Sequence, residues 1–169
     1  IDTTARPNAQ GVFPSRHPAA LTEAAVKAIQ ADREAIETEL AEAWCAVETT
    51  PLYVDGGTCG SAVAAKSPLA IGVVKSHHRL YADERGFRIL VNLRPGERTS
   101  VFRVTRKNIS VASWYVRTRS AKGRDALFGL IRVEAALTDD ISARADEVSR
   151  WILAEGAPLA LPDGRWDKM

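Results

Sequence analysis

Asp55 ends a short apolar stretch, Leu52 to Val54, and two glycines follow it directly. A carboxylate at the end of a strand is held on a rigid element, where it can reach a divalent metal or a phosphate-bearing substrate. Gly56 and Gly57 allow a sharp turn and a close backbone approach. The alternative interpretation is an Asp-Gly turn that only ends a strand, because this dipeptide is common in turns.

A second carboxylate, Glu134, lies near the end of a strongly apolar stretch that begins at Leu127. The two-residue period of a strand places Glu134 and Arg132 on the same side. We predict that Glu134 joins Asp55 around Mn²⁺ or Mg²⁺, which prefer hard oxygen ligands, and that Arg132 binds phosphate. The alternative is an edge strand with one side in water.

The segment from Lys75 to Arg79 contains two histidines, and it follows the second apolar stretch of the chain. Lys75 and Arg79 suit phosphate contacts, and His77 or His78 could assist proton transfer. Paired histidines in a loop are more often simply exposed. Trp114 lies close to Arg117, as aromatics do in single-strand grooves, but its strand position favours the core.

Basic residues are concentrated in one part of the chain. The net charge is only +2, but residues 75–124 contain thirteen Lys and Arg against three Asp and Glu. Such density on strand-forming sequence indicates a polyanion partner, with Arg103 and Arg117 as candidate nucleic-acid contacts. The alternative is a solvated surface that balances an acidic helix near the N-terminus.

Length and composition predict one domain. A chain of 169 residues matches a single domain, which we place at residues 19–169 after a Pro-containing arm at residues 1–18. The absence of an initiator Met favours a fragment of a longer polypeptide. No apolar run reaches the ~20 residues that span a membrane, and two cysteines without a disulfide framework favour the cytoplasm.

Hydrophobic periodicity predicts an element order of helix, strands, helix. The first helix covers residues 19–47, and its apolar stripe of Val26, Ile29, Ile36, Leu40 and Trp44 either lies across its own sheet or packs on another subunit. Strands are expected at residues 52–55, 69–76, 99–105, 110–119 and 127–137, with 87–93 a short strand or helix. A last helix, capped by Thr138 or Asp139, runs to about residue 154.

These elements predict a mixed α/β fold, with a central sheet flanked by helices. The connections between residues 69 and 137 are short or rich in turns, so much of the sheet should be antiparallel. The strand order does not follow from the sequence alone.

The motifs Tyr53-Val-Asp-Gly-Gly57, Ile71-Gly-Val-Val-Lys75-Ser76 and Gly129-Leu-Ile-Arg-Val-Glu134 resemble those of the NurA-type nucleases. The resemblance spans about residues 50–165 and implies a ribonuclease-H-like fold, related at a distance to the Piwi domain. It also implies Mn²⁺-dependent cleavage of DNA, a homodimer, and a HerA-type translocase as partner. Gly57 departs from the Asp-Gly-Ser that is typical of the family. Asp83, Asp140 and above all Asp163 are candidates for a further acidic residue.

The sequence therefore supports three hypotheses. The first is a metal-dependent DNA nuclease of end processing or phage defence, with Asp55, Glu134 and Asp163 as acidic residues and Lys75, Arg132 and Arg165 on phosphates. The second is a catalytically inactive nucleic-acid-binding or assembly module. The third is a subunit of a larger complex in which the acidic first helix docks a partner.

Overall fold

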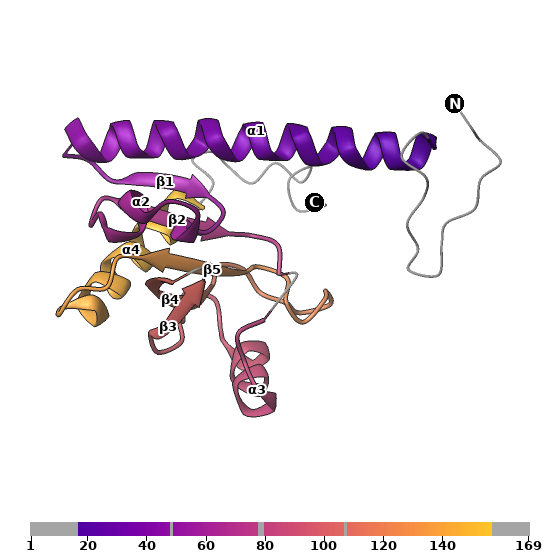
Figure 1. Cartoon of the computed structure of the whole chain (residues 1–169). Coiled ribbons are helices and arrows are strands. Elements are labelled where there is room, and N and C mark those ends of the chain that lie inside the picture. The colour runs from indigo at the N-terminus through magenta and orange to yellow at the C-terminus, as the bar shows by residue number, and fades with distance from the viewer. Residues whose placement is uncertain (1–16, 48, 78–79, 107, 157–169) are drawn as a thin grey trace.

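The strands form one mixed sheet in the order β1-β2-β5-β4-β3. The computed structural model describes residues 17–47, 49–77, 80–106 and 108–156. β1 (Leu52–Asp55) and β2 (Ala70–Val74) are parallel, whereas β3 (Phe102–Arg106), β4 (Ile109–Arg117) and β5 (Leu130–Ala135) join by antiparallel pairing. The predicted mixed α/β class and the largely antiparallel sheet are confirmed (Figure 1).

One face of the sheet is covered by α4 (Ile141–Glu155). The buried stripe of this helix, Ala145, Val148 and Ile152, packs against Ile71, Trp114, Val133 and neighbouring strand residues. This is the stripe that its 3.6-residue period predicts. Trp114 is fully buried, and its indole nitrogen donates to Ser149 Oγ at 3.0 Å, so it belongs to the core as expected.

The opposite face is covered by shorter elements. They are the 3-10 turn η1 (Thr58–Gly60), α2 (Ala62–Lys66) and α3 (Glu84–Asn92). α3 resolves the ambiguity at residues 87–93 in favour of a helix, and Asp83 caps it by accepting a hydrogen bond from Gly86 N at 2.7 Å. α2 was not predicted, although Ser61 is a good N-cap whose hydroxyl accepts from Val63 N and Ala64 N.

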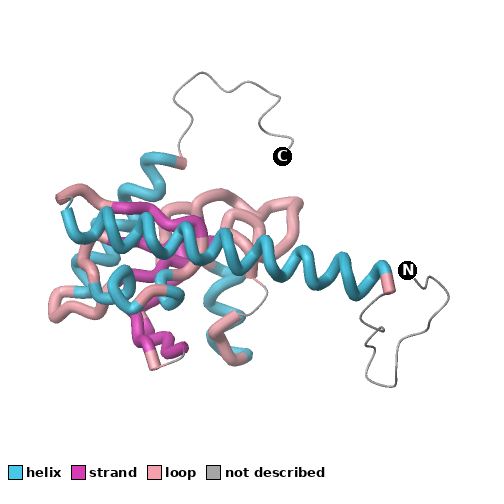
Figure 2. The backbone as a smooth tube through the Cα atoms, turned by 45° about the horizontal axis from the view of Figure 1, so that its top comes forward, coloured by secondary structure: helices cyan, strands magenta, loops and turns pink. Residues whose placement is uncertain are grey.

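The first helix, α1 (Pro18–Val47), has the predicted position, but it lies differently on the domain. Only its C-terminal part packs on the sheet, where Ala41 joins a small cluster with Ala64 and Ala70. The rest runs past the sheet edge (Figures 1 and 2). The apolar stripe is exposed, so the expectation that it lies across its own sheet is wrong. None of the helices in the described ranges is long and apolar enough to cross a bilayer.

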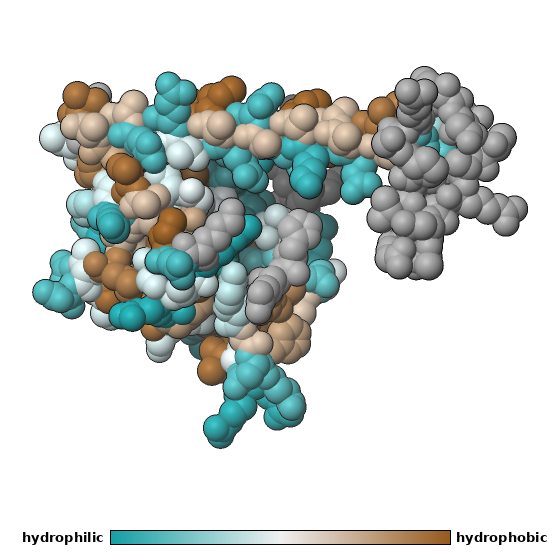
Figure 3. Space-filling view, viewed as in Figure 1, coloured by the Kyte–Doolittle hydropathy of each residue, from teal (hydrophilic) through white to brown (hydrophobic). Residues whose placement is uncertain are grey.

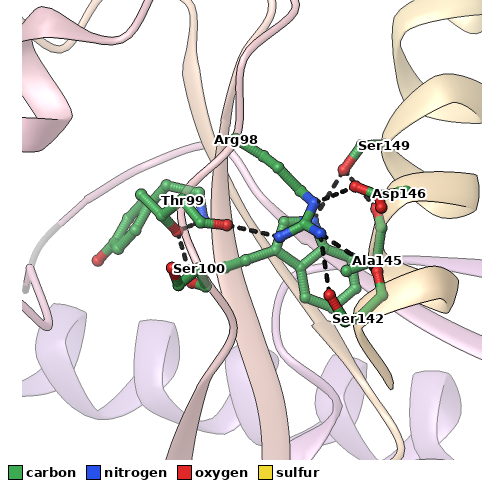
Figure 4. Close-up of polar contacts among 9 residues, drawn as sticks. Arg98, Thr99, Ser100, Ser142, Ala145, Asp146 and Ser149 are labelled. Carbon is green, nitrogen blue, oxygen red and sulfur yellow. Dashed lines mark hydrogen bonds and ion pairs between the residues drawn. The ribbon is translucent and has the colours of Figure 1, made fainter. Parts of the chain in front are cut away.

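Arg98 ties the segment before β3 to α4 (Figure 4). Its Nε donates to Asp146 Oδ1 at 2.6 Å, and its Nη2 donates to the Ser142 carbonyl at 3.2 Å. The guanidinium also donates to the Thr99 carbonyl at 2.8 Å. These contacts join segments about 45 residues apart, so the Arg98 side chain adds a polar link to the apolar packing of α4 on the sheet.

We expect Asp146→Asn to lower the melting temperature at pH 7. The hydrogen bond and charge of Arg98 lower the pKa of the Asp146 carboxyl in the folded protein. A depressed folded pKa stabilises the fold above the unfolded value of about 3.9 and loses that effect as pH falls through the folded pKa. Melting curves of both proteins should therefore converge at acid pH. A gap that stays constant or widens on acidification would contradict this, and Asp139→Asn serves as control.

Candidate functional site

A glycine-rich turn, residues 56–61, connects β1 to α2 and covers part of β5. Gly56 adopts a φ of 125°, which side chains other than glycine rarely tolerate. Its amide donates to the Val73 carbonyl at 3.0 Å and so extends the pairing of the parallel strands. The turn then lays Gly57 and Thr58 directly over Glu134.

Glu134 is buried beneath this turn, with a side chain that is only 3% exposed. One of its carboxylate oxygens, Oε2, accepts from Thr58 N at 2.9 Å, and the other, Oε1, lies 2.9 Å from Arg132 Nη2. The Arg132 guanidinium in turn stacks 4.7 Å from the centre of the Tyr81 ring. Both carboxylate oxygens are therefore engaged, which holds Glu134 in one orientation.

The packing around Glu134 explains why position 57 is a glycine. A Cβ built at Gly57 would stand 2.6 Å from Glu134 Oε2, closer than real Cβ atoms approach, and 3.1 Å from its Cδ, which is a tight contact. The serine that is typical of NurA-type motifs at this place would therefore displace the Glu134 carboxylate. The glycine at position 57 therefore leaves the room that the buried Glu134 carboxylate needs.

We expect Gly57→Ala to lower the free energy of unfolding by about 1–3 kcal/mol, because overpacking forces a buried group to shift. Gly60→Ala is the matched control, since a Cβ there meets nothing within 4 Å. Chemical denaturation of both variants measures the difference. Equal stabilities would mean that the Glu134 carboxylate moves freely and is not held by Thr58 and Arg132.

Glu134 and Asp55 both line a cavity of about 460 Å³ between α1 and the carboxyl ends of β1 and β2. We call it the Glu134 cavity. Arg33, Arg106 and Arg132 add positive charge, and Tyr81 and Ser76 add hydroxyl groups. Cys59 also lines it, and burial, followed by the nearby charge of Glu134, raises the pKa of this thiol to about 11. The thiol is therefore neutral at pH 7 and a poor nucleophile.

The side chain of Asp55 does not share the face of Glu134. Asp55 pairs with Val73 and Glu134 pairs with Gly72, so the two-residue period places them on opposite sides of the sheet. Tyr53 lies on the same side as Asp55, and burial, followed by the charge of Glu155 in α4, raises the pKa of its hydroxyl. This register does not support the prediction that Asp55 and Glu134 hold one ion together, which stays a prediction.

The described residues do not fit a Mn²⁺ or Mg²⁺ centre. No group of three or more His, Cys, Asp and Glu lies together in the described part of the chain. An ion at Glu134 would have to displace the Arg132 guanidinium, and Asp55 is ion-paired with Lys75 at 3.2 Å. Asp163, the third predicted acidic residue, lies outside the described residues. Asp83 and Asp140 stand at helix N-caps.

The predicted nucleic-acid contacts differ in their exposure and in their partners. Arg117 is fully buried, and its guanidinium donates to the carbonyls of Leu90, Ala126 and Phe128, so it is unavailable to a phosphate. Arg132 is also buried and ion-paired with Glu134, so a phosphate at Arg132 would compete with this carboxylate. Arg103 is exposed on β3, in agreement with a surface role. Arg79 and Arg165 lie outside the described residues.

A second cavity, of about 350 Å³, lies on the α4 side of the sheet, and we call it the Lys75 cavity. Its rim carries two cations, Lys75 and Arg119, and its apolar lining includes Val73, Phe128, Ile131 and Ile152. Sequence reasoning identified Lys75 but not Arg119, which was only one of thirteen bases in the basic window. His77 is not in this cavity, because its Nε2 bonds the Leu130 carbonyl at 2.8 Å.

The loop that carries Arg119 is well ordered by its own hydrogen bonds. Thr118 donates to the Gly129 carbonyl through both its amide, at 2.7 Å, and its hydroxyl, at 2.9 Å, which closes residues 118–129 at their base. Gly129 has a φ of 68°, and a Cβ there would meet the Arg119 backbone at 2.8 Å, so only glycine fits. The loop therefore presents Arg119, and also Lys122 and Arg124, from a fixed frame.

No protein-family model matches this chain, and no curated protein matches it significantly. The resemblance to NurA-type nucleases therefore remains a prediction that rests on three short motifs.

Proposed function

We propose that this domain binds single-stranded nucleic acid through the Lys75 cavity. The observation that carries the proposal is that two cations and an aromatic ring, Lys75, Arg119 and Phe128, line one cavity beside an ordered basic loop. Cations next to a stacking platform are what a single strand needs, because its phosphates and its bases are both accessible.

The cations of this surface are available to phosphates. The Lys75–Asp55 ion pair is 3.2 Å long, but its side chains are 65% and 77% exposed. Exposed pairs of this kind contribute little stability and exchange partners readily. Arg119 and Lys122 are exposed on the closed loop. Because hydrogen bonds close the base of this loop, positioning these charges on binding costs less conformational entropy.

Phe128 supplies a surface for a base. It is half-buried in the cavity wall, and the Arg124 guanidinium lies 5.3 Å from the centre of its ring. Base stacking on an aromatic side chain contributes roughly 1–3 kcal/mol and tolerates any base. The proposed binding is therefore independent of sequence.

We expect Lys75→Glu/Arg119→Glu to weaken binding of a fluorescent oligothymidylate by at least about tenfold, as read by anisotropy in EDTA. The slope of log K against log salt should become shallower by about 0.7 for each lost phosphate contact. Arg85→Glu/Arg88→Glu is the matched control, because it changes the net charge by the same amount and both arginines are exposed on α3, on the opposite face. Equal losses of affinity in both variants would mean that binding depends only on net charge, and the proposed site would be wrong.

Metal-dependent DNA cleavage of the NurA type is a second candidate. It is favoured by the position of the Glu134 cavity at the carboxyl ends of two parallel strands, where α/β proteins commonly bind ligands. The described residues alone do not supply its metal ligands, so cleavage would need acidic groups from elsewhere. A ribonuclease-H-like classification is proposed with it, supported by the mixed sheet between two helical layers. The HerA-type translocase and the homodimer stay predictions.

A further inference from the structure

The stripe of α1 formed by Val26, Ile29, Ile36, Leu40 and Val47, which we call the α1 stripe, has no cover in the described part of the chain. Ile29, Leu40 and Val47 are 67%, 65% and 80% exposed. Figure 3 shows apolar side chains along the edge of α1 that points away from the sheet. Exposed apolar surface of this extent on one element indicates an interaction site.

The side of α1 that packs on the domain is a different one. Ala41 and Cys45 contact α2 and the first two strands, and Glu42 accepts a hydrogen bond from Ser61 Oγ at 2.7 Å. With 100° per residue, this side lies well around the helix from the α1 stripe. The domain thus anchors the C-terminal part of α1, and no described residue covers the stripe.

The stripe has the spacing of a coiled-coil seam. The a and d positions of three successive heptads, in alternating steps of three and four, are Val26, Ile29, Arg33, Ile36, Leu40, Ala43 and Val47. From Val26 to Val47 the seam is about 30 Å long at 1.5 Å per residue. Residues repeated at a and d in this way can pack knobs-into-holes against one more helix.

The flanks of this seam carry only negative charge or none. The e and g positions are Glu23, Ala25, Gln30, Asp32, Glu37, Glu39, Trp44 and Ala46. In a parallel pair of two copies, Asp32 would face Glu37, and in an antiparallel pair like positions would face each other. Charges at e and g set partner choice, so the seam disfavours a second copy of this chain.

We propose that the α1 stripe docks an amphipathic helix of another protein whose apolar a and d residues are flanked by Lys and Arg. Charge complementarity across the seam selects this partner, since basic e and g residues would pair with Asp32, Glu37 and Glu39. Arg33 pairs with Glu37 at 3.2 Å and lines the Glu134 cavity, so it lies at the edge of the seam nearest the domain and makes no demand on the partner. The surface is separate from the Lys75 cavity, so the inference does not depend on nucleic-acid binding.

Two synthetic four-heptad peptides test the inference against the full chain. Both carry Ile and Leu at a and d, with Lys at e and g in one and Glu in the other. We expect the Lys peptide to bind with micromolar affinity in fluorescence anisotropy and the Glu peptide at least about tenfold more weakly. Added salt should narrow the difference. Ile36→Glu should weaken binding of the Lys peptide by a similar factor. Ala31→Glu, which adds the same charge outside the stripe, should leave this affinity unchanged.

Three outcomes would overturn the proposal. Equal binding of both peptides would remove the charge argument. A dimer in light scattering that Ile36→Glu splits into folded monomers would show that a second copy covers the stripe. Loss of vesicle binding in Ile36→Glu, with anionic phospholipid vesicles, would identify a lipid surface instead. Thermal melts of Ile36→Glu should match the wild type, because this side chain is 58% exposed.

Discussion

Arg117→Met is expected to lower the free energy of unfolding by about 3–5 kcal/mol, the range for removing one member of a buried charged network. Arg117 is fully buried, and its three carbonyl acceptors come from α3 and from the loop before β5. Burial lowers the pKa of its guanidinium, but the carbonyls stabilise the charged form. Methionine fills much of the volume and leaves all three carbonyls without a donor, each at a cost.

Arg103→Met provides the control for this prediction. Arg103 is exposed on β3, and surface substitutions of this kind usually change stability by less than about 0.5 kcal/mol. Urea denaturation of the two variants should separate clearly. Similar midpoints would mean that the Arg117 guanidinium reaches solvent, and its assignment as a nucleic-acid contact would regain support.

Glu134→Gln is expected to destabilise the protein by about 3–5 kcal/mol, because it leaves the buried Arg132 charge without a counter-ion. The two side chains are 11% and 3% exposed, and they lie 2.9 Å apart. Replacing both members, as Arg132→Met/Glu134→Leu, should restore most of the loss, since apolar pairs often substitute for buried ion pairs. The sign of this stability change is informative, because neutralising a strained active-site carboxylate commonly stabilises a protein. A Glu134→Gln variant more stable than the wild type would favour the catalytic interpretation.

Much of the fold follows from the sequence, because periodicity encodes it locally. The period of α4 predicts its buried stripe, and the alternation in β3 and the apolar sequence of β5 predict strands. The α1 stripe has equally good periodicity, yet it is exposed. Periodicity reports that one side of a helix is apolar, but not whether the protein itself or a partner covers it. The helix α2 between β1 and β2 was missed because it has only five residues.

The candidate site was harder to predict, because it depends on register. The sequence places Asp55 at the end of one strand and Glu134 on another, but a shift of one residue in pairing moves a side chain to the opposite face. Arg117 and Arg119 also differ in their surroundings, since Arg117 is buried and Arg119 is exposed. Both residues are arginines, so only the tertiary packing distinguishes the structural arginine from the candidate phosphate contact.

The account is tested most directly by incubating labelled linear single-stranded DNA with the protein in EDTA, Mg²⁺ or Mn²⁺ and resolving each mixture on native and denaturing gels. Because Asp55 and Glu134 lie on opposite faces and each has its own cationic partner, we expect retarded but intact DNA in all three. The Lys75→Glu/Arg119→Glu variant should release it. Scission in Mn²⁺ that disappears in both Asp55→Asn and a folded Glu134→Gln would contradict the account, because it would show the two carboxylates acting together.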